Sequence, residues 1–268
     1  MNSKGIIERI TDWSKNKIIE SKQKGFVVGI SGGIDSAVVS NLCAMTGYPV
    51  ICLSMPINSS EGLSTIQMEW LKSKYANVTA FTVDLSKAFN TFLECLPLEA
   101  TKEIALINTM SRLRMATLYA FSGSCEYLVA GTGNKIEDYG IGFFTKYGDG
   151  GVDISPIGSL KKTEVFTIAK YMEIPKSIQE AKPTDGLWED GRSDEDQIGA
   201  TYKDLEWAMV FCDGVGIKSW SEFLKVKPYL MELTEAQEKI LNIYLSRHEQ
   251  NEHKMEMPPI CRISNKLF

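Results

Sequence analysis

The sequence predicts an α/β protein in which a doubly wound, mostly parallel sheet is flanked by helices. Over the first half of the 268-residue chain, short apolar segments alternate with segments of helical periodicity. The apolar segments are continuous runs, which is typical of strands that are covered on both faces. Glycine-rich turns follow two of these strands, at the carboxyl ends where such sheets bind their ligands.

The first half of the chain is expected to contain four strands and five helices. Strands that alternate with crossover helices are expected to be parallel. The strands are predicted over residues 26–30, 49–56, 78–85 and 127–130. The helices are predicted over residues 6–21, 35–45, 65–75, 88–96 and 101–121.

The second half of the chain is expected to be richer in turns. Residues 143–156 contain three glycines and no helical periodicity, so they are predicted to form a loop before a helix over residues 161–172. Residues 183–199 are acidic and turn-rich, and a loop of this length is usually functional or disordered. Residues from 202 onward are predicted to be helical. We expect a single domain over residues 1–268, with a core at about 22–180, a lid loop at 183–199 and a C-terminal helical segment at 200–268.

Composition argues against several classes of protein. The net charge is −5 and the pI is about 5.3, whereas a nucleic-acid-binding surface is usually basic. No apolar run approaches the roughly 18 residues of a membrane span, and the charged N-terminal segment does not resemble a signal peptide. The two histidines exclude a multi-histidine metal centre, and no two of the six cysteines form a CxxC pair. We therefore expect a cytoplasmic protein that binds neither nucleic acid nor membrane.

The most informative segment is FVVGISGGIDSAVVSNL, residues 26–42. It has no lysine for a Walker A loop, and it does not match the GxGxxG of dinucleotide-binding turns. As an SGGxDS turn between a strand and a helix, it would direct backbone N–H groups and the hydroxyls of Ser31 and Ser36 toward an anion. Asp35 would repel a phosphate unless a cation lay between them, so it implies Mg²⁺. The alternative is a tight turn in which Asp35 is only a helix N-cap.

The SGGIDS motif resembles the pyrophosphate loop of the N-type ATP pyrophosphatases, which adenylate an acid or a carbonyl and release pyrophosphate. This resemblance implies a three-layer, Rossmann-like fold of the adenine nucleotide alpha hydrolase type. Four later motifs resemble the NAD synthetases, and with them the resemblance covers residues from about 6 to 254. These motifs are SRLRMATLYAFS, LVAGTGNKIEDYGIGFFTKYGDGGVDISPIGSLKKTEV, KPTDGLWEDGRSDEDQIG and EHK.

The resemblance to NAD synthetases implies a ligase that forms a C–N bond, with ATP as co-substrate and Mg²⁺ as cofactor. It would convert deamido-NAD and ammonia to NAD through an acyl-adenylate, releasing AMP and pyrophosphate. No amidohydrolase domain precedes the motifs, which favours the ammonia-dependent form, and the family implies a homodimer. The alternatives are another pyrophosphate-loop enzyme, such as one that modifies tRNA, and a nucleotide-binding module without catalysis.

The resemblance also implies residues for ATP and for Mg²⁺. Asp35 and Glu137 would bind Mg²⁺. Asp138 is the alternative to Glu137, because the spacing to FFTK is one residue longer than in some relatives. No catalytic residue is assigned beyond Asp35 and Lys162. The residues expected to bind ATP are Gly29, Ile30, Ser31, Gly32, Gly33, Ile34, Asp35, Ser36, Thr132, Lys162 and Thr184.

The residues that the resemblance implies for deamido-NAD are Arg112, Lys146, Asp153, His253 and Lys254. Arg112 and Arg114 lie roughly 200° apart on one helix, so only one can face a given ligand. The resemblance selects Arg112, and Arg114 is expected in a surface or interface salt bridge. The alternative for Asp153 is to brace the GDGG turn. The loop at 183–199 would close as a lid against water, or would only cap the following helix with its acidic residues.

Overall fold

Four parallel strands form one sheet in the order β3-β2-β1-β4. From β1 (Gly25–Gly29) the chain builds outward through β2 (Val50–Ser54) and β3 (Val78–Thr82), then crosses back to place β4 (Tyr127–Val129) on the other side of β1. The strand order therefore reverses between β1 and β4. Such a reversal is the switch point at which open α/β sheets bind ligands. The computed structural model describes residues 1–59, 62–183, 193–229 and 232–263.

Helices cover both faces of the sheet, which confirms the doubly wound α/β prediction. One apolar core is built with α1 (Ser3–Ser21), α2 (Ile34–Met45), α3 (Gly62–Lys74) and α6 (Lys162–Tyr171). The core on the opposite face is built with α4 (Ser86–Glu94) and α5 (Glu103–Cys125), which the short helix η1 (Leu98–Ala100) connects.

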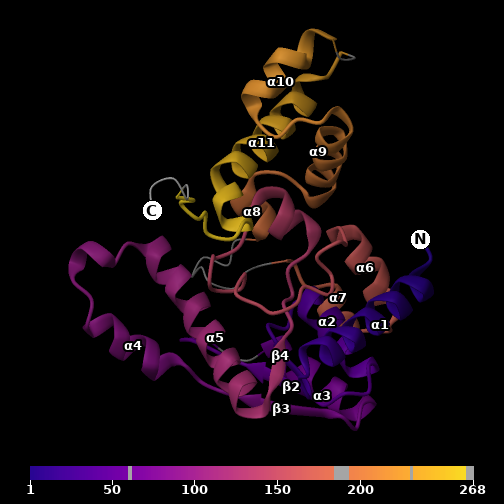
Figure 1. Cartoon of the computed structure of the whole chain (residues 1–268), viewed down its shortest axis with the longest axis vertical. Helices are drawn as coiled ribbons and strands as arrows, with labels where there is room; N and C mark the ends of the chain where they lie inside the picture. Colours follow the sequence, from indigo (N-terminus) through magenta and orange to yellow (C-terminus); the bar gives the residue numbers. More distant parts are fainter. Residues whose placement is uncertain (60–61, 184–192, 230–231, 264–268) are drawn as a thin grey trace.

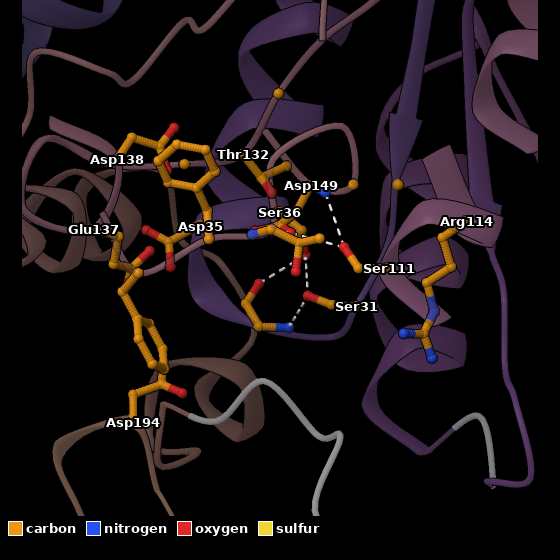
Figure 2. A pocket seen from close by; sticks show the side chains of 18 of the residues that line it. Ser31, Asp35, Ser36, Ser111, Arg114, Thr132, Glu137, Asp138, Asp149 and Asp194 are labelled. Atoms are coloured by element: carbon orange, nitrogen blue, oxygen red, sulfur yellow. Dashed lines mark hydrogen bonds between the residues drawn. The ribbon is translucent and has the colours of Figure 1, made fainter. Parts of the chain in front are cut away.

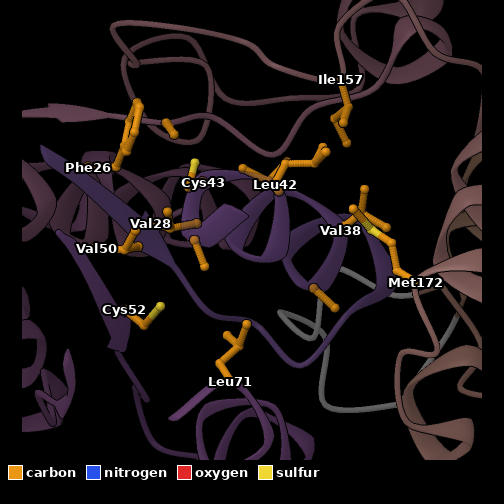
Figure 3. Close-up of a cluster of buried hydrophobic side chains, with 14 of the residues drawn as sticks. Phe26, Val28, Val38, Leu42, Cys43, Val50, Cys52, Leu71, Ile157 and Met172 are labelled. Carbon is orange, nitrogen blue, oxygen red and sulfur yellow. The ribbon is translucent and has the colours of Figure 1, made fainter. Parts of the chain in front are cut away.

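Successive residues of the strands enter opposite cores. Phe26 and Val28 of β1 pack in the α2 core with Leu42, as Figure 3 shows, whereas Val27 packs in the α5 core. All four side chains are fully buried. This explains why the strands are continuous apolar runs, since neither face of the sheet is left to solvent.

The four strands and five helices predicted for the first half are present, with ends that differ by a few residues. The prediction missed η2 (Lys135–Ile141), a π-helix, and the short helices α7 (Lys176–Gln179) and α8 (Asp194–Ile198). A π-helix has a wider turn than an α-helix, so the 3.6-residue apolar period does not identify it. The loop predicted at 143–156 is confirmed, with one bridge from Ile154 to Ala130.

The C-terminal helices form a further apolar core above the sheet (Figure 1). This core contains η2 and α8 together with α9 (Tyr202–Val215), α10 (Trp220–Val226) and α11 (Glu235–Met255). The short helix η3 (Lys227–Tyr229) follows α10 and has no buried residue. The division into one domain with a lid stays a prediction. Within the described part of the chain, no helix combines the length and the apolarity that crossing a bilayer requires.

Candidate active site

A cavity of about 920 Å³ lies at the switch point of the sheet. Its walls come from the turn after β1, the turn after β4, the N-terminus of α6 and the C-terminal half of α11. All eight predicted residues of the SGGIDS region, from Gly29 to Ser36, line it, as do Thr132, Glu137 and Lys162. A cavity of this size and position is the usual ligand site of an open α/β sheet.

The turn after β1 leaves the N-terminus of α2 open to the cavity. Gly33 is the N-cap residue, and no side chain caps the helix in its place. Ser31 Oγ accepts a hydrogen bond from the Gly33 amide at 3.1 Å and lies 3.2 Å from Ser36 Oγ. Gly32 has φ +81°, and a side chain there would meet the backbone of Ser64 at 2.7 Å. The open helix end and its hydroxyls form a site suited to a phosphate.

Lys162 joins the two strand-end turns through a buried ion cluster. Its ammonium lies 2.6 Å from Asp35 Oδ2 and 3.0 Å from Glu137 Oε1, and its side chain is only 4% exposed. Burial disfavours the charge on Lys162, but Asp35 and Glu137 outweigh this and raise its pKa. Burial raises the pKa of Asp35, and the Lys162 ammonium opposes that rise. We take the cluster as ionised, because each of its charges has a partner in hydrogen-bonding distance.

The residues around Lys162 fit a magnesium ion that binds together with a nucleotide. Asp35 and Glu137 carry more negative charge than the single lysine balances, and both line the cavity. Among the described residues, no three His, Cys, Asp or Glu side chains are grouped closely enough to hold a metal alone. Mg²⁺ typically binds through one or two carboxylates plus substrate phosphates and water, so this donor set suits it.

Two further carboxylates that face the cavity, Asp138 and Asp149, carry a raised pKa. For Asp138 the pKa is well above the usual range because of burial and the charges of Glu137, Asp149 and Asp35. For Asp149 burial is again the main cause, although Ser111 and the Thr145 amide donate to its Oδ1 at 2.7 and 2.9 Å. Figure 2 shows Asp35, Glu137 and Asp138 on one side of the pocket and Arg114 on the other. The cavity is therefore acidic on one side.

Four of the five residues expected to bind deamido-NAD line a smaller hollow. Arg112, Lys146, His253 and Lys254 gather there, and Lys254 also lines the main cavity. Arg112 Nε donates to the Lys146 carbonyl at 3.3 Å. Asp153 is not in either lining. Its carboxylate accepts from the Val129 amide at 2.8 Å and the Tyr119 hydroxyl at 3.0 Å, so it braces the loop against β4.

Sequence reasoning missed several residues of the site. Arg114 was not assigned to the site and was expected only in a surface or interface salt bridge; it lines the cavity and donates from Nε to the Met55 carbonyl at 3.0 Å. Asn134 caps η2, and its Nδ2 lies 3.3 Å from Asp35 Oδ1. An asparagine directly after AGTG is a recognisable N-cap signal, whereas no local pattern identifies Arg114. Thr184 lies outside the described residues.

The C-terminal half of α11 holds the end of η2 and the start of the loop that follows it. His248, Asn251 and Lys254 contact the carbonyls of Gly140, Ile141 and Gly142 respectively. Lys254 also donates to the Phe144 carbonyl at 2.8 Å, and Lys146 donates to the His253 carbonyl at 2.6 Å. The last carbonyls of a helix have no partner within it, and here a second helix supplies donors for them. The wall of the cavity is thereby fixed in place.

The fold and the site define a class, namely an α/β protein of the pyrophosphate-loop type, with that loop at the switch point of its sheet. The family model for NAD synthase matches residues 6–258, and the chain belongs to that family. The NH(3)-dependent NAD(+) synthetase of Archaeoglobus fulgidus is 36% identical over 269 residues, which cover 100% of both chains.

Solved structures agree with this family. The NMN synthetase from Francisella tularensis is 30% identical with a TM-score of 0.82, and the match covers 98% of this chain and 100% of that one. The NH3-dependent NAD synthetase from Campylobacter jejuni is 26% identical with a TM-score of 0.75, and the match again covers 98% and 100%. The similarity therefore extends over the whole fold, including the C-terminal helices.

Proposed function

We propose that this chain amidates the nicotinate carboxylate of deamido-NAD with ammonia and uses ATP to do so, giving NAD, AMP and pyrophosphate. Membership of the NAD synthase family supports the reaction. The observation that carries the proposal is the cavity in which the pyrophosphate-loop turn, Thr132 and the Lys162 cluster face one another. The two alternatives, another pyrophosphate-loop enzyme and a nucleotide-binding module without catalysis, do not explain why the NAD synthase family model matches nearly the whole chain.

The chemistry explains why such a site needs ATP. A carboxylate is a poor electrophile because ammonia would have to displace an oxide. Attack of the carboxylate on the α-phosphate forms an acyl-adenylate and releases pyrophosphate. Ammonia then attacks the acyl carbon, AMP leaves with the bonding electron pair, and the nitrogen loses one proton to the medium. A cavity that excludes water protects this intermediate from hydrolysis.

Each part of the site has a role in this proposal. The amides at the N-terminus of α2, with Ser31 and Ser36, would hold the phosphates that leave as pyrophosphate. The Lys162 ammonium would bind the charge that develops on the transferred phosphoryl group. Asp35 and Glu137 would hold Mg²⁺, which neutralises phosphate charge when it is bound. Thr132 would contact ATP from the turn after β4.

The smaller hollow is proposed to bind the negatively charged part of the second substrate. Arg112, Lys146, His253 and Lys254 supply cationic or hydrogen-bonding groups there. Arg112 is exposed, and its position makes it available to a phosphate. Asp153 is proposed to act indirectly, because both of its oxygens are already used to hold the loop.

A second candidate substrate is the mononucleotide, nicotinate mononucleotide, with NMN as the product. It is favoured by one observation: the NMN synthetase from Francisella tularensis has a TM-score of 0.82, against 0.75 for the Campylobacter jejuni NAD synthetase. Both substrates carry the same nicotinate carboxylate and ribose phosphate. They differ only in the adenylate half, so the same reaction chemistry serves either one.

The experiment offers the purified chain ATP, Mg²⁺ and ammonium with either deamido-NAD or nicotinate mononucleotide, and follows the amide product and pyrophosphate. NAD formation with a higher kcat/KM supports the first candidate, and a preference for the mononucleotide supports the second. If neither substrate yields an amide, while pyrophosphate is also absent, the proposed ligase activity is wrong. Glutamine in place of ammonium serves as the negative control.

We also propose that the chain forms a homodimer and works in the cytoplasm. The support for the dimer is the start of α5, where apolar side chains stay exposed although most apolar residues of the helix pack against the sheet core. A second copy would cover these exposed apolar side chains. Ile104 is 55% exposed on this helix, and Leu98 before it is 88% exposed.

A further inference from the structure

Tyr202 occupies a fixed position between the C-terminal core and the ion cluster. It is the first residue of α9, directly after the N-cap Thr201, and it is 5% exposed. Its backbone amide donates to Glu195 Oε1 at 2.9 Å. The ring belongs to the C-terminal apolar core. The backbone and the ring of Tyr202 are therefore both held, and only the hydroxyl reaches toward polar groups.

The side chain of Tyr202 contacts Glu137 and Lys162 of the ion cluster, and also Asp194. Its hydroxyl lies 2.5 Å from Glu137 Oε1 and 3.2 Å from Asp194 Oδ2. The Lys162 ammonium lies 4.8 Å from the centre of its ring, which is within range of a cation–π interaction. Tyr202 itself is not part of the cavity lining, whereas Glu137, Lys162 and Asp194 are. Any effect of Tyr202 on a ligand must therefore pass through one of these three residues.

The contacts of Glu137 use its two oxygens differently. A hydroxyl has one proton to donate. Because the contact with Glu137 Oε1 is the shorter of the two, Tyr202 donates its hydrogen bond to that oxygen. Lys162 donates to the same oxygen at 3.0 Å. Among the described residues, no hydrogen bond to Glu137 Oε2 is recorded. One oxygen of this carboxylate is thus held twice, and the other is left for a ligand in the cavity.

We propose that Tyr202 is a positioning residue, whose hydroxyl holds Oε1 of Glu137 so that Oε2 is presented to the divalent cation of the bound nucleotide. This inference rests on the proposed function of the site as a metal–nucleotide site. Groups that hold a ligand carboxylate in this way commonly change metal affinity by about 10–100-fold when they are removed. Phenylalanine has the same six-membered ring as tyrosine. Tyr202→Phe therefore removes the hydroxyl while the ring stays in the core and over Lys162.

The matched control is Tyr244. It is a second buried tyrosine of the same core, 4% exposed, and it stacks against His248. It has no recorded hydrogen bond from its hydroxyl in the described part of the chain and no contact with Glu137 or Lys162. Tyr244→Phe therefore removes a buried hydroxyl from the same core without touching the cluster, and it measures the purely structural effect.

The test titrates Mn²⁺ as the probe into wild type, Tyr202→Phe and Tyr244→Phe with α,β-methylene-ATP, and follows free Mn²⁺ by electron paramagnetic resonance. We expect Mn²⁺ affinity to fall at least about 10-fold in Tyr202→Phe and to stay within twofold of wild type in Tyr244→Phe. In the amidation assay, high Mg²⁺ should restore most of the kcat of Tyr202→Phe, because the defect lies in metal binding. Thermal unfolding checks that both variants are folded.

Unchanged Mn²⁺ affinity in Tyr202→Phe would overturn the inference, and so would an equal loss in Tyr244→Phe. The binding measurement separates this inference from the proposed reaction. If wild type makes no amide but Tyr202→Phe binds Mn²⁺ about 10-fold more weakly, the reaction is wrong and the role of Tyr202 stands. If wild type is active and Tyr202→Phe binds Mn²⁺ normally, the reaction stands and the role of Tyr202 is wrong.

Discussion

At the scale of single residues, the site depends on one buried lysine shared by two carboxylates. Lys162 and Asp35 bury their charges together, and neither is stable in that position without the other. Removing one member of such a pair leaves an unbalanced buried charge, which typically costs about 3–5 kcal/mol. The same arrangement places a cation and carboxylates where a nucleotide and its metal are proposed to bind. Stability and activity are therefore linked at these residues.

Asp35→Asn is expected to lower the rate of amide formation by at least about 100-fold, since it removes a proposed metal ligand and a partner of Lys162. The measurement is product formation at saturating ATP, with folding checked by circular dichroism. Asp12→Asn, at an exposed position on α1, is the matched control and should keep the wild-type rate. A rate for Asp35→Asn close to wild type would contradict the assigned role.

Asp138→Asn is expected to stabilise the folded protein at neutral pH. Burial, followed by the charges of Glu137, Asp149 and Asp35, raises the pKa of Asp138 above that of the unfolded chain. Such a group contributes stability that is fully present below its unfolded pKa and is lost as the pH rises through its folded pKa. The variant, which carries no charge, should therefore gain a few degrees in Tm at pH 7–8.

Calorimetry of wild type and Asp138→Asn between about pH 4 and pH 8 measures this difference. The gain should shrink as the pH falls, because the wild-type carboxyl then becomes neutral as well. A lower Tm for the variant at pH 8 would show that the Asp138 charge is compensated by an interaction that outweighs its burial. Asp12→Asn, at an exposed position on α1, is the control. Asp204→Asn is not used, because the Asp204 carboxylate takes part in a helix cap.

At the scale of elements, the site is built where short segments end. The turn after β1 and the turn after β4 were predictable, because SGGIDS and AGTGN carry their glycines and hydroxyls in local sequence. The η2 helix was not predicted, because a π-helix does not follow the 3.6-residue apolar period. Its shape depends on donors from His248, Asn251 and Lys254, more than 100 residues later in the chain. Local patterns carry no information about partners at that separation.

Gly32→Ala is expected to weaken ATP binding about 10-fold or more and to lower Tm, since the Cβ would lie 2.7 Å from Leu63 Cβ and from the Ser64 amide. Gly47→Ala is a matched control, because Gly47 has φ +82° against +81° for Gly32 but has no atom within 4 Å of its Cβ position. Both variants carry the same backbone strain, and only Gly32→Ala adds the clash. Calorimetric titration with ATP measures the difference, and equal affinities in the two variants would contradict the steric argument.

Asn251→Ala is expected to destabilise the protein by about 1–3 kcal/mol, because the Ile141 carbonyl loses its donor at 2.9 Å. Asn242→Ala, an exposed position on the same helix, should change stability by less than about 0.5 kcal/mol. Urea unfolding measures both values. Similar values for the two variants would show that the contact between α11 and the η2 loop adds little to the fold.

At the scale of the whole molecule, the cavity lies between the sheet and the C-terminal core. The sheet side was predictable from the sequence, because strand periodicity and the first motif place it at the switch point. The opposite side, with Arg247, Gln250 and Asn251 of α11, was not, since it depends on how two cores pack together. Arg112 and Arg114 illustrate the same difficulty. Their separation around α5 was clear from the sequence, but the identity of the one that faces the main cavity required the tertiary structure.

The proposed dimer gives a prediction for the assembled molecule. Ile104→Asp on α5 should weaken self-association at least about 10-fold, because a charge would be buried against the second copy. Ile19→Asp on α1 replaces an isoleucine that is 63% exposed, against 55% for Ile104, and should leave association unchanged. Sedimentation velocity over a range of concentrations measures both. A monomeric wild-type protein would contradict the dimer, and equal association of the two variants would place the interface elsewhere.

The ion pair between Asp35 and Lys162 joins residues that are 127 positions apart. At a synthesis rate of about 5–20 residues per second, the ribosome needs about 6–25 s to make the intervening chain. During that interval the nascent nucleotide loop has already emerged without its counter-ion. It follows that the newborn polypeptide cannot complete its pocket while translation is in its first half, and that ATP becomes a ligand of this chain only late in its synthesis.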